Sequence, residues 1–418
     1  MAAFHIPPAL KHRKFVLLWL GLMISQAGSQ MQIWALFWHI STLSSNPIAV
    51  SVIGAIRFVP VVLFSLLAGL VADRYNRRKI VFLTQITATL VAIALGVLTM
   101  THTITLWYIY ALTAIQAAAI AFDLPARQSL IPSLLPPEDL PSAFSLQSIA
   151  FNMGSIVGPG LSGIIIAYYG QEYTYYLNAV SFIAVIVALI LMGHVSQPAP
   201  QNAMSIKNSL GDIRAGIRFI RNQPIIISSM VLDFIATFFS SANTLLPYLA
   251  HSVLHVDAII YGWLAAAQSI GAVTAGVIIS QLSDLRRQGT ILLAAVGAFG
   301  LITILFGLST WVDLTFLTLI GIGAADTVST VIRNTVRQMQ TPDAMRGRMT
   351  GINQIFFMGG PQLGEIEAGA VAQAFGVPFA IISGGIGTIL GAWLIVLRWP
   401  QLLKYDHQEP QPAAAPAD

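Results

Sequence analysis

The stretch GLVADRYNRRKIV, from Gly69 to Val81, separates two long apolar runs of the chain. The first run ends at Asp73-Arg74, and the second begins directly after Lys79. A charged segment of this kind lies in water, whereas apolar runs of about 20 residues cross a lipid bilayer as helices. The stretch therefore predicts a tight hairpin between two membrane helices, with its charges on one side of the bilayer.

The composition of the whole chain excludes a soluble globular protein. Of its 418 residues, 56% are hydrophobic and only 9% are charged, whereas a soluble domain carries about 25% charged residues. The net charge of +4 sits in short loops beside apolar runs, so we interpret it as an orientation signal and expect no nucleic-acid partner. The chain has no cysteine, which excludes disulfides and cysteine metal sites. We expect no metal and no cofactor.

Twelve apolar runs are long enough to span a bilayer. They occupy residues 15–43, 48–72, 79–100, 104–125, 142–168, 174–195, 224–250, 258–282, 289–310, 313–338, 348–374 and 376–398. We therefore predict an all-α membrane protein with twelve transmembrane helices and both termini on one side. Of the 21 Lys and Arg residues, all but Arg57 fall in the tails or at the helix ends of one face. The positive-inside rule makes this face cytoplasmic and predicts a multi-pass protein of the bacterial cytoplasmic membrane.

The chain divides into two similar halves. Met358-Gly359 repeats Met153-Gly154 at an offset of 205 positions, and Asp284 follows one apolar run as Asp73 follows another. We predict an N-terminal six-helix bundle, a cytoplasmic linker with a basic amphipathic helix, a C-terminal six-helix bundle and a disordered cytoplasmic tail. Their boundaries are 1–195, 196–223, 224–400 and 401–418.

The opening stretch resembles the loop motif between the second and third helices of major facilitator superfamily transporters. The matching residues are Gly69, Asp73, Arg74, Arg77 and Arg78. Asn76 stands where the motif has glycine. Because Asn tolerates positive φ better than most residues, we expect the turn to form with it.

A second motif, in the fifth apolar run, resembles the antiporter motif of the same superfamily. It consists of Gly154, Gly158, Pro159 and Gly163. Small residues four positions apart let helix backbones approach closely. Two interpretations stay open, namely ordinary close packing and a smooth interface along which the two halves rock.

Longer segments point to one branch of this superfamily. DTVSTVIRNTVRQ, TPDAMRGRM and QLGEIEAG in the second half, with AIRFVP and FDLPARQSLIP in the first, resemble the enterobactin-exporter-like (transmembrane secretion effector) branch. The resemblance covers nearly the whole chain. It implies a monomeric secondary transporter built from two pseudo-symmetric six-helix bundles. It also implies export of a small organic molecule, siderophore- or drug-like, by proton antiport with alternating access.

Charged residues inside the predicted membrane helices are candidate coupling residues, because a charge in the bilayer needs a partner or a water-filled cavity. Arg57 lies about 13 Å from the outer end of its helix, and Glu365 and Glu367 lie at similar depth in the eleventh helix. In this fold the second and eleventh helices face each other. Further charges of this kind are Asp233, Asp326 and Arg333.

We predict that one of the two glutamates pairs with Arg57 while the outer side is closed. Protonation would weaken this pair and favour the outward-open state. Residues two positions apart point about 200° apart on a helix, so Glu365 and Glu367 do not face Arg57 equally well. The alternative is a purely structural ion pair. In proton-coupled relatives the fourth helix carries an arginine where this chain has Thr113, which shifts the coupling role toward Arg57.

On the cytoplasmic side, we expect Asp73 to lie near the N-terminus of the eleventh helix, whose dipole favours an anion. Arg77 would bridge Asp73 to Asp123 and so lock the inner gate. Arg127 lies at the same helix end as Asp123.

The first apolar run carries a polar stripe, which consists of Ser25, Gln26, Ser29, Gln30 and Gln32. Polar side chains facing lipid are costly, so the stripe faces other helices or a wet cavity. Packing between helices and lining of a cavity both stay open. The candidate cavity residues are Gln26, Gln30 and Gln116.

Two other classes of function remain. One is a facilitator or importer of a small solute on the same fold. The other is a membrane enzyme or assembly factor, but the sequence has no HExxH, phosphate-binding loop or nucleophile elbow. We therefore expect no enzyme, and we expect a small organic substrate, protons and the lipid bilayer as partners.

Overall fold

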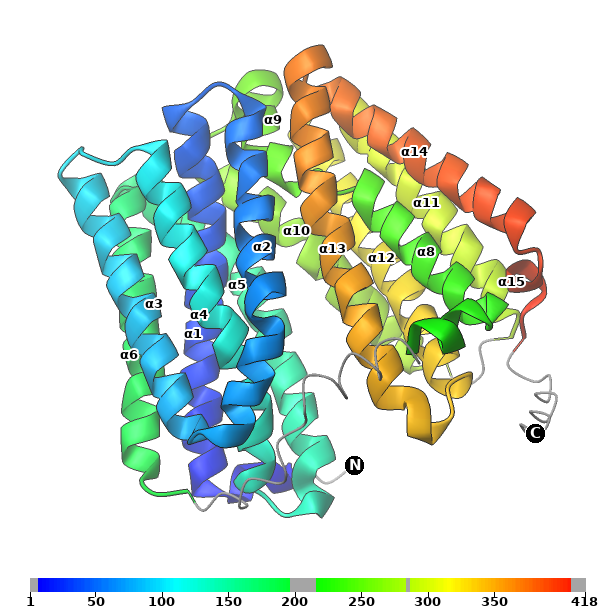
Figure 1. Cartoon of the computed structure of the whole chain (residues 1–418). Helices are drawn as coiled ribbons and strands as arrows, with labels where there is room; N and C mark the ends of the chain where they lie inside the picture. The colour runs from blue at the N-terminus through cyan, green and yellow to red at the C-terminus, as the bar shows by residue number, and fades with distance from the viewer. Residues whose placement is uncertain (1–6, 196–215, 283–285, 407–418) are drawn as a thin grey trace, which may run out of the picture.

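The computed structural model describes residues 7–195, 216–282 and 286–406, except for some side chains in α2 and α13. These residues form twelve long helices in two groups of six (Figure 1). The N-terminal half contains α1 (Arg13–Leu43), α2 (Pro47–Arg74), α3 (Arg77–Met100), α4 (Leu106–Leu130), α5 (Leu140–Tyr168) and α6 (Gln171–Met192). The C-terminal half contains α8 (Pro224–Phe239), α10 (Ala258–Ser280), α11 (Gln288–Leu308), α12 (Val312–Met339), α13 (Asp343–Phe375) and α14 (Val377–Arg398).

The predicted all-α fold is confirmed, and each predicted apolar run overlaps one of these helices. The short helical turn η1 (Pro8–Lys11) precedes α1, and the turns η2 (Ile131–Ser133) and η3 (Pro137–Asp139) join α4 to α5. Figure 1 shows the two halves side by side, with the start of α1 and the end of α14 toward the same side.

The hairpin after α2 uses Asn76 as a helix cap. Its φ is −63°, and its side-chain oxygen accepts a hydrogen bond from Lys79 N at 3.1 Å. The expected positive φ at this position is wrong, because Tyr75 and Asn76 both lie in the extended region and the chain reverses without a left-handed residue. Asn suits the N-cap of α3, since it pairs an N–H that has no partner in the helix.

The seventh membrane helix is broken, whereas the sequence predicted one continuous helix at 224–250. α8 ends at Phe239, and the chain continues through η4 (Asn243–Leu245), α9 (Leu246–Leu249) and the π-turn η5 (Ala250–Leu254). Pro247 lies just after this break and has no N–H for a bond to the preceding turn. After the break, η4 contacts α2 and α9 contacts α1, so this part of the chain reaches the N-terminal half.

Part of the tail that was predicted to be disordered is ordered. α15 (Gln401–Lys404) follows α14, and Leu402 is buried. Tyr405 O accepts a hydrogen bond from Gly289 N at 3.1 Å, so this segment packs on the start of α11. The Pro/Ala-rich remainder, 407–418, lies outside the described residues, as does most of the predicted linker helix; residues 216–221 are helical.

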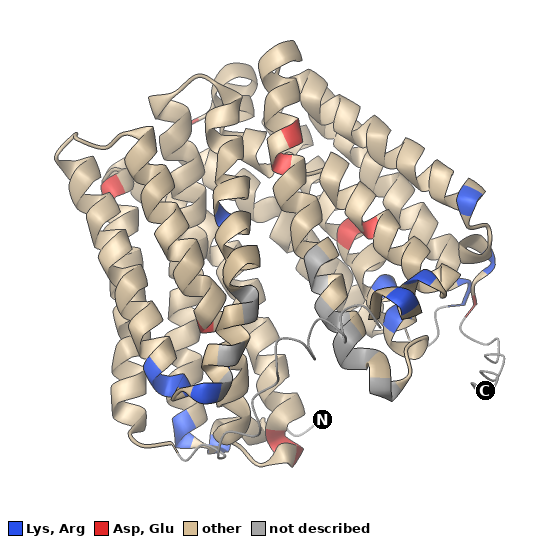
Figure 2. Cartoon of the chain, viewed as in Figure 1, with Lys and Arg blue, Asp and Glu red and all other residues tan. Residues whose placement is uncertain are grey.

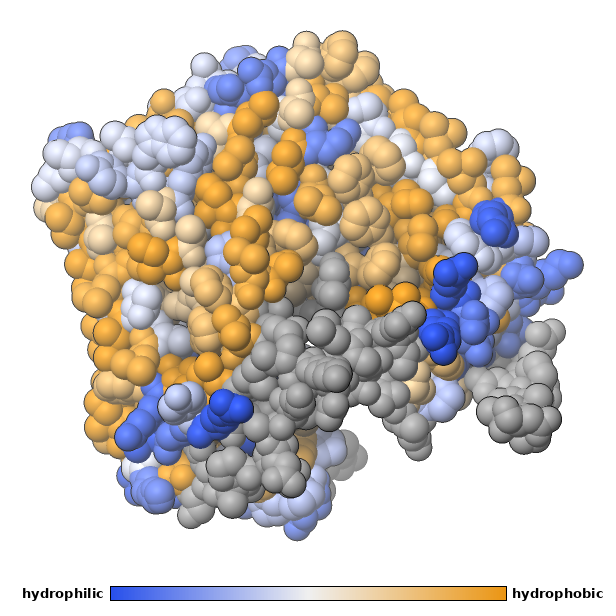
Figure 3. All heavy atoms as spheres, viewed as in Figure 1, coloured by the Kyte–Doolittle hydropathy of each residue, from blue (hydrophilic) through white to orange (hydrophobic). Residues whose placement is uncertain are grey.

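The surface around both halves is apolar. Leu63 is 66% exposed and Leu317 is 64% exposed, and Figure 3 shows a broad apolar area between the two hydrophilic ends of the visible face. Within the described residues, ten segments are long and apolar enough to cross a membrane. α1 and α13 are not among them, and these two helices carry the polar stripe and the two glutamates. The protein is a multi-pass membrane protein, because only lipid suits so extensive an apolar surface.

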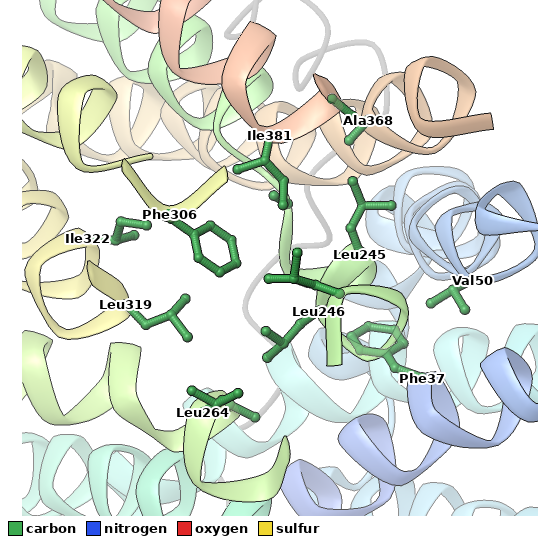
Figure 4. Packing of buried hydrophobic residues seen from close by; sticks show 14 of the residues in the cluster. Phe37, Val50, Leu245, Leu246, Leu264, Phe306, Leu319, Ile322, Ala368 and Ile381 are labelled. Carbon is green, nitrogen blue, oxygen red and sulfur yellow. The ribbon is translucent and has the colours of Figure 1, made fainter. Parts of the chain in front are cut away.

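We call the end at which α1 begins and α14 ends the terminal face, and the opposite end, at which α1 ends and α2 begins, the far face. Lys and Arg gather toward the terminal face in both halves (Figure 2). The two halves share a core near the far face, where Phe37 and Val50 pack with Leu245, Leu246 and Leu264 (Figure 4). Other clusters belong to one half each, and the ribbons of the halves diverge toward the terminal face (Figure 1).

Candidate transport cavity and gate

Two tyrosines of the C-terminal half hold main-chain carbonyls of the N-terminal half near the far face. Tyr248 OH lies 2.9 Å from Ser44 O and 2.8 Å from Asn46 O, and these two carbonyls share its single proton. Tyr261 OH donates to Trp34 O at 3.0 Å. The sequence did not single out either tyrosine, because a Tyr in an apolar run indicates a hydrogen-bond partner without identifying it.

An aromatic layer reinforces the same contact. The Trp38 ring lies between His251, at a centroid distance of 4.1 Å, and Tyr261, at 4.8 Å. Among the described residues, the hydrogen bonds between the two halves all lie near the far face. They are the bonds of Tyr248 and Tyr261 and one between Ser51 Oγ and Thr244 Oγ1 at 3.4 Å. The far face is therefore closed by hydrogen bonds and ring contacts.

Glycines allow α5 and α10 to meet across the halves. A Cβ on Gly262 would lie 2.6 Å from Pro159 O and 2.9 Å from Gly163 Cα, so the two backbones touch. A Cβ on Gly158 would lie 2.7 Å from a main-chain oxygen of α1, and Gly154 packs on α1 as well. The antiporter-like motif thus makes two contacts, one within its own half and one with the other half.

Glu365 of α13 lies against α2 at Gly54. A Cβ on Gly54 would lie 2.5 Å from Glu365 Oε2, and the exposed fraction of Glu365 is 8%. This oxygen has no hydrogen-bond partner among the described residues. Gly54 precedes Arg57 by about one helical turn toward the far face. Glu365 is consequently a buried acid in the closed contact between α2 and α13.

The predicted ion pair between Arg57 and a glutamate is not formed. Among the described side chains, no carboxylate lies within 4.0 Å of the Arg57 guanidinium, although Arg57 and Glu365 act on each other electrostatically. The reason is that Glu365 sits over Gly54 while Arg57 turns toward a cavity. Glu367 is half-buried and points about 200° away from Glu365, on another side of α13.

A polar cavity of about 350 Å³ lies in the N-terminal half, among α1 to α6. Arg57 reaches it from α2, and Gln26 and Gln30 from α1. Gln116 of α4 and the rings of Phe151 and Phe182 complete a wall of amides and aromatic carbon. The guanidinium and amides can hydrogen-bond a ligand, while the rings supply apolar contact.

The polar stripe of α1 both packs and lines the cavity. Gln32 is 5% exposed, donates to Gln116 Oε1 at 2.8 Å and accepts from Asn178 Nδ2 at 2.6 Å. Gln30 donates to Ser155 Oγ at 3.2 Å. Gln32 therefore ties α1 to α4 and α6, and Gln26 and Gln30 stand at the cavity surface.

A buried carboxylate group lies at another part of the same cavity wall. Asp123 Oδ2 lies 3.1 Å from Arg127 Nη2, and Asp123 Oδ1 accepts from Thr84 Oγ1 at 2.9 Å and from Gln85 Nε2 at 3.2 Å. Arg77 instead donates to the main chain, to Ser129 O at 3.0 Å. The expected bridge from Arg77 to Asp123 is absent in this conformation, because Asp123 is already satisfied within α3 and α4.

The other residues of the loop motif lie at the terminal end of α2 and α3. Arg78 donates to Leu189 O at 2.9 Å and so ties α3 to α6, and Arg74 is exposed. A Cβ on Gly69 would meet nothing within 4 Å. The side chain of Asp73, and with it the expected position near α13, lies outside the described residues.

Four intramembrane charges of the C-terminal half, other than the two glutamates of α13, form one group between α8 and α12. Arg333 Nη2 lies 2.8 Å from Asp233 Oδ1 and 3.8 Å from Asp326 Oδ1. Arg337 Nη1 lies 3.9 Å from Asp233 Oδ2, and the Arg337 guanidinium also donates to Asn334 and Asn353. Both Arg333 and Asp233 are 1% exposed.

A second pocket, of about 870 Å³, lies at the far face. Its lining includes Ser41, Asn46, Tyr248, His251 and Gln373, which come from both halves. Sequence reasoning missed this pocket because its lining comes from segments far apart in the chain. The closed contact between the halves brings these segments together.

Comparisons with known proteins agree with this architecture. The family described as transmembrane secretion effector has a model that matches residues 6–416. The enterobactin exporter EntS of Citrobacter koseri is 27% identical over 378 residues, which cover 88% of this chain and 86% of that protein. The enterobactin exporter EntS of Escherichia coli O1:K1 is 27% identical over 370 residues, with the same coverage.

Solved transporter structures share the fold. The nucleoside transporter NupG has a TM-score of 0.69 at 16% identity, covering 94% of this chain and 99% of its own. Another is a bacterial homologue of the human lysosomal transporter Spinster in an inward-facing and unoccupied conformation. It has a TM-score of 0.71 at 15% identity, and the match covers 96% of this chain and 97% of that one. At such identities the likeness shows the fold alone.

Proposed function

Because the chain belongs to the transmembrane secretion effector family of the major facilitator superfamily, we propose that it exports a small organic molecule and that its terminal face is cytoplasmic. The relatives in this family are exporters of enterobactin, and the gathering of Lys and Arg toward the terminal face supports the orientation. In this orientation the structure is closed on the outer side, and its halves diverge toward the cytoplasm.

Alternating access requires that the far-face contact opens and closes. The contact consists of the shared apolar core, tyrosine hydrogen bonds, ring contacts and glycine-mediated helix packing. Each hydrogen bond contributes only about 0.5–1.5 kcal/mol, so these bonds do not by themselves prevent opening. The cavity with Gln26, Gln30 and Gln116 receives the substrate from the cytoplasm, and opening of the far face releases it outside.

Glu365 is the residue that couples this motion to protons, and its position in the closed contact is the observation that carries the proposal. A buried carboxylate without a hydrogen-bond partner or a cation at contact distance is costly, and a bound proton removes its charge. Proton binding to Glu365 therefore favours packing of α2 on α13. Loss of the proton favours the outward-open state, where water reaches the charged group.

The sequence led us to expect that protonation favours the outward-open state, whereas here loss of the proton favours it. The effect is reversed because Glu365 is not paired with Arg57 in the closed contact. The cycle runs as antiport. Glu365 takes a proton from outside, the outer side closes, and the proton leaves toward the cytoplasmic cavity, where Arg57 attracts the carboxylate that remains. The unprotonated protein then turns outward with its substrate.

Transport into everted membrane vesicles tests the proposal, with enterobactin and ethidium as probes and a protonophore as a control. We expect the wild type to accumulate at least one probe only while a proton gradient exists. Glu365→Gln should abolish accumulation, because a permanently neutral side chain holds the far face closed. Glu367→Gln is the matched control and should accumulate the probe at close to the wild-type rate.

Proton-driven accumulation by Glu365→Gln at the wild-type rate would remove Glu365 from the coupling. Accumulation that is indifferent to the protonophore would instead make the protein a facilitator, which is the second function that the fold allows. Arg57→Gln should keep the fold and slow accumulation, since the Glu365 carboxylate loses its nearby cation in the cavity.

A further inference from the structure

Asp326 stands midway along α12 and points away from lipid. Leu317 is 64% exposed on the apolar surface, and Asp326 lies nine positions later, which is two and a half turns and places it on the opposite side of the helix. Arg333, seven positions later and about 20° away around the helix, meets Asp233 of α8, and Gly323 meets Gln268 of α10. The Asp326 side chain nevertheless stays 37% exposed, so a ligand can reach its carboxylate.

Among the described side chains, the cation within 4.0 Å of Asp326 is Arg333, and it is already engaged. Arg333 Nη2 lies 2.8 Å from Asp233 Oδ1 but 3.8 Å from Asp326 Oδ1, and it also donates to Thr330 Oγ1 at 2.8 Å. Among the described residues, no hydrogen-bond donor reaches the Asp326 carboxylate. Asp326 thus keeps free acceptor positions on its exposed side.

A structural role explains Asp233 but not Asp326. Asp233 is on α8 and Arg333 is on α12, so their ion pair joins two helices. Asp326 and Arg333 are seven positions apart on the same helix, so their longer contact joins nothing. A half-exposed acid inside a membrane protein that ties no elements together is a candidate functional group.

We propose that Asp326 binds the positive charge of the exported molecule, which would be an organic cation, and that a proton competes for the same carboxylate. The inference rests on the proposed function and names its substrate class. Asp233, Asp326, Arg333 and Arg337 carry two negative and two positive charges, which balance. One added positive charge, either a proton or the cation, is tolerated there better than two.

Of the charged and titratable groups around this site, Asp326 is the one that can exchange a proton for the cation. Asp233 of α8 and Arg333 of α12 act on it electrostatically, and Arg337 follows one turn beyond Arg333. α10 offers only Tyr261, which donates to Trp34 O, and α11 has no titratable side chain between Gln288 and Leu308. Asp233 is held between Arg333 and Arg337 and is only 1% exposed, so a ligand does not reach it.

Binding of ethidium to the purified full-length protein in lipid nanodiscs tests the site, with fluorescence anisotropy as the readout. Ethidium keeps its positive charge across the pH range used, so any pH dependence comes from the protein. We expect weaker binding at pH 5.5 than at pH 8, and release of protons when ethidium is added to weakly buffered protein. Uncharged Nile red should show neither effect.

Asp326→Asn should weaken ethidium binding at least tenfold and remove its pH dependence, while Nile red binding stays unchanged. Asp313→Asn, on an exposed turn of the same helix, is the matched control and should bind ethidium as the wild type does. Asp326→Glu should restore most of the affinity, which separates loss of the charge from loss of the fold.

Equal ethidium binding by Asp326→Asn and the wild type would overturn the inference, and so would failure of the wild type to bind ethidium at any pH. Failure of the proposed function gives a different pattern. If vesicles showed no outward transport while ethidium binding still depended on Asp326 and pH, the cation site would stand and the direction of transport would be wrong.

Discussion

The hydroxyl of Tyr248 lies 2.8 Å from the main-chain oxygen of Asn46, and donates a hydrogen bond across the two halves of the molecule. Asn46 is the N-cap of α2 and lies in the hairpin between α1 and α2. One side chain of the C-terminal half therefore holds the first far-face hairpin of the N-terminal half. This bond requires the two halves to be in contact at the far face.

Tyr248→Phe should increase the population with an open far face. Loss of one hydrogen bond of about 0.5–1.5 kcal/mol changes the ratio of the two states about two- to tenfold. The chain contains no cysteine, so a Ser51→Cys background gives a single reporter that is 1% exposed in the closed state. Labelling of this cysteine by a membrane-impermeant maleimide from the far face should become faster in the Tyr248 variant.

Tyr110→Phe is the matched control for the gate. Tyr110 OH donates to Ala49 O at 2.8 Å, so this variant loses a similar bond inside one half. Its labelling rate should stay at the value of the Ser51→Cys background. Equal acceleration by both tyrosine variants would show that Tyr248 has no special role in closure.

Gly262→Ala should slow transport without unfolding the protein. Its new Cβ would lie 2.6 Å from Pro159 O, which is too close for two packed helices, so α10 must move away from α5. Gly297→Ala is the control, because a Cβ there meets nothing within 4 Å. Transport rates in vesicles, with fluorescence-detected size exclusion as the folding check, should separate the two. A Gly262 variant that transports like the Gly297 variant contradicts the close contact.

The ion pair between Asp233 and Arg333 should show strong coupling in a double-mutant cycle. Asp233→Asn or Arg333→Met alone leaves an unbalanced buried charge, which costs about 3–5 kcal/mol. The double variant removes one charge of each sign and should recover most of the lost stability. Thermal unfolding in detergent measures all four proteins. A double variant no more stable than Arg333→Met would mean that the two side chains do not balance each other.

Gln32→Leu should destabilise the N-terminal half. It leaves Gln116 Oε1 and Asn178 Nδ2 without the partner that each has at present, and an unsatisfied buried polar group costs about 1–3 kcal/mol. Gln26→Leu replaces a cavity residue of the same helix. It should leave the melting temperature close to that of the wild type and change substrate affinity instead. Similar melting temperatures for the two variants would argue against the amide network.

The sequence by itself determined the membrane class, the number of long helices and the side on which positive charge gathers. Each depends on local composition, because about 20 apolar residues span a bilayer wherever they pack. The prediction failed at Asn76 and at the break after Phe239, where the chain had two local conformations available. Asn76 caps α3 instead of forming a left-handed turn. After Phe239 the chain starts new short helical segments instead of continuing α8.

Only the tertiary structure decided which charges meet. Helical spacing placed Arg57, Glu365 and Asp326 in the membrane, but whether two side chains pair depends on how far apart two helices lie and how each is rotated. Gly54 lets α13 approach α2, so Glu365 lies over Gly54, one helical turn from Arg57, and does not pair with the Arg57 guanidinium. In the same way, the contacts of α12 engage Arg333 with Asp233 and leave the Asp326 side chain 37% exposed.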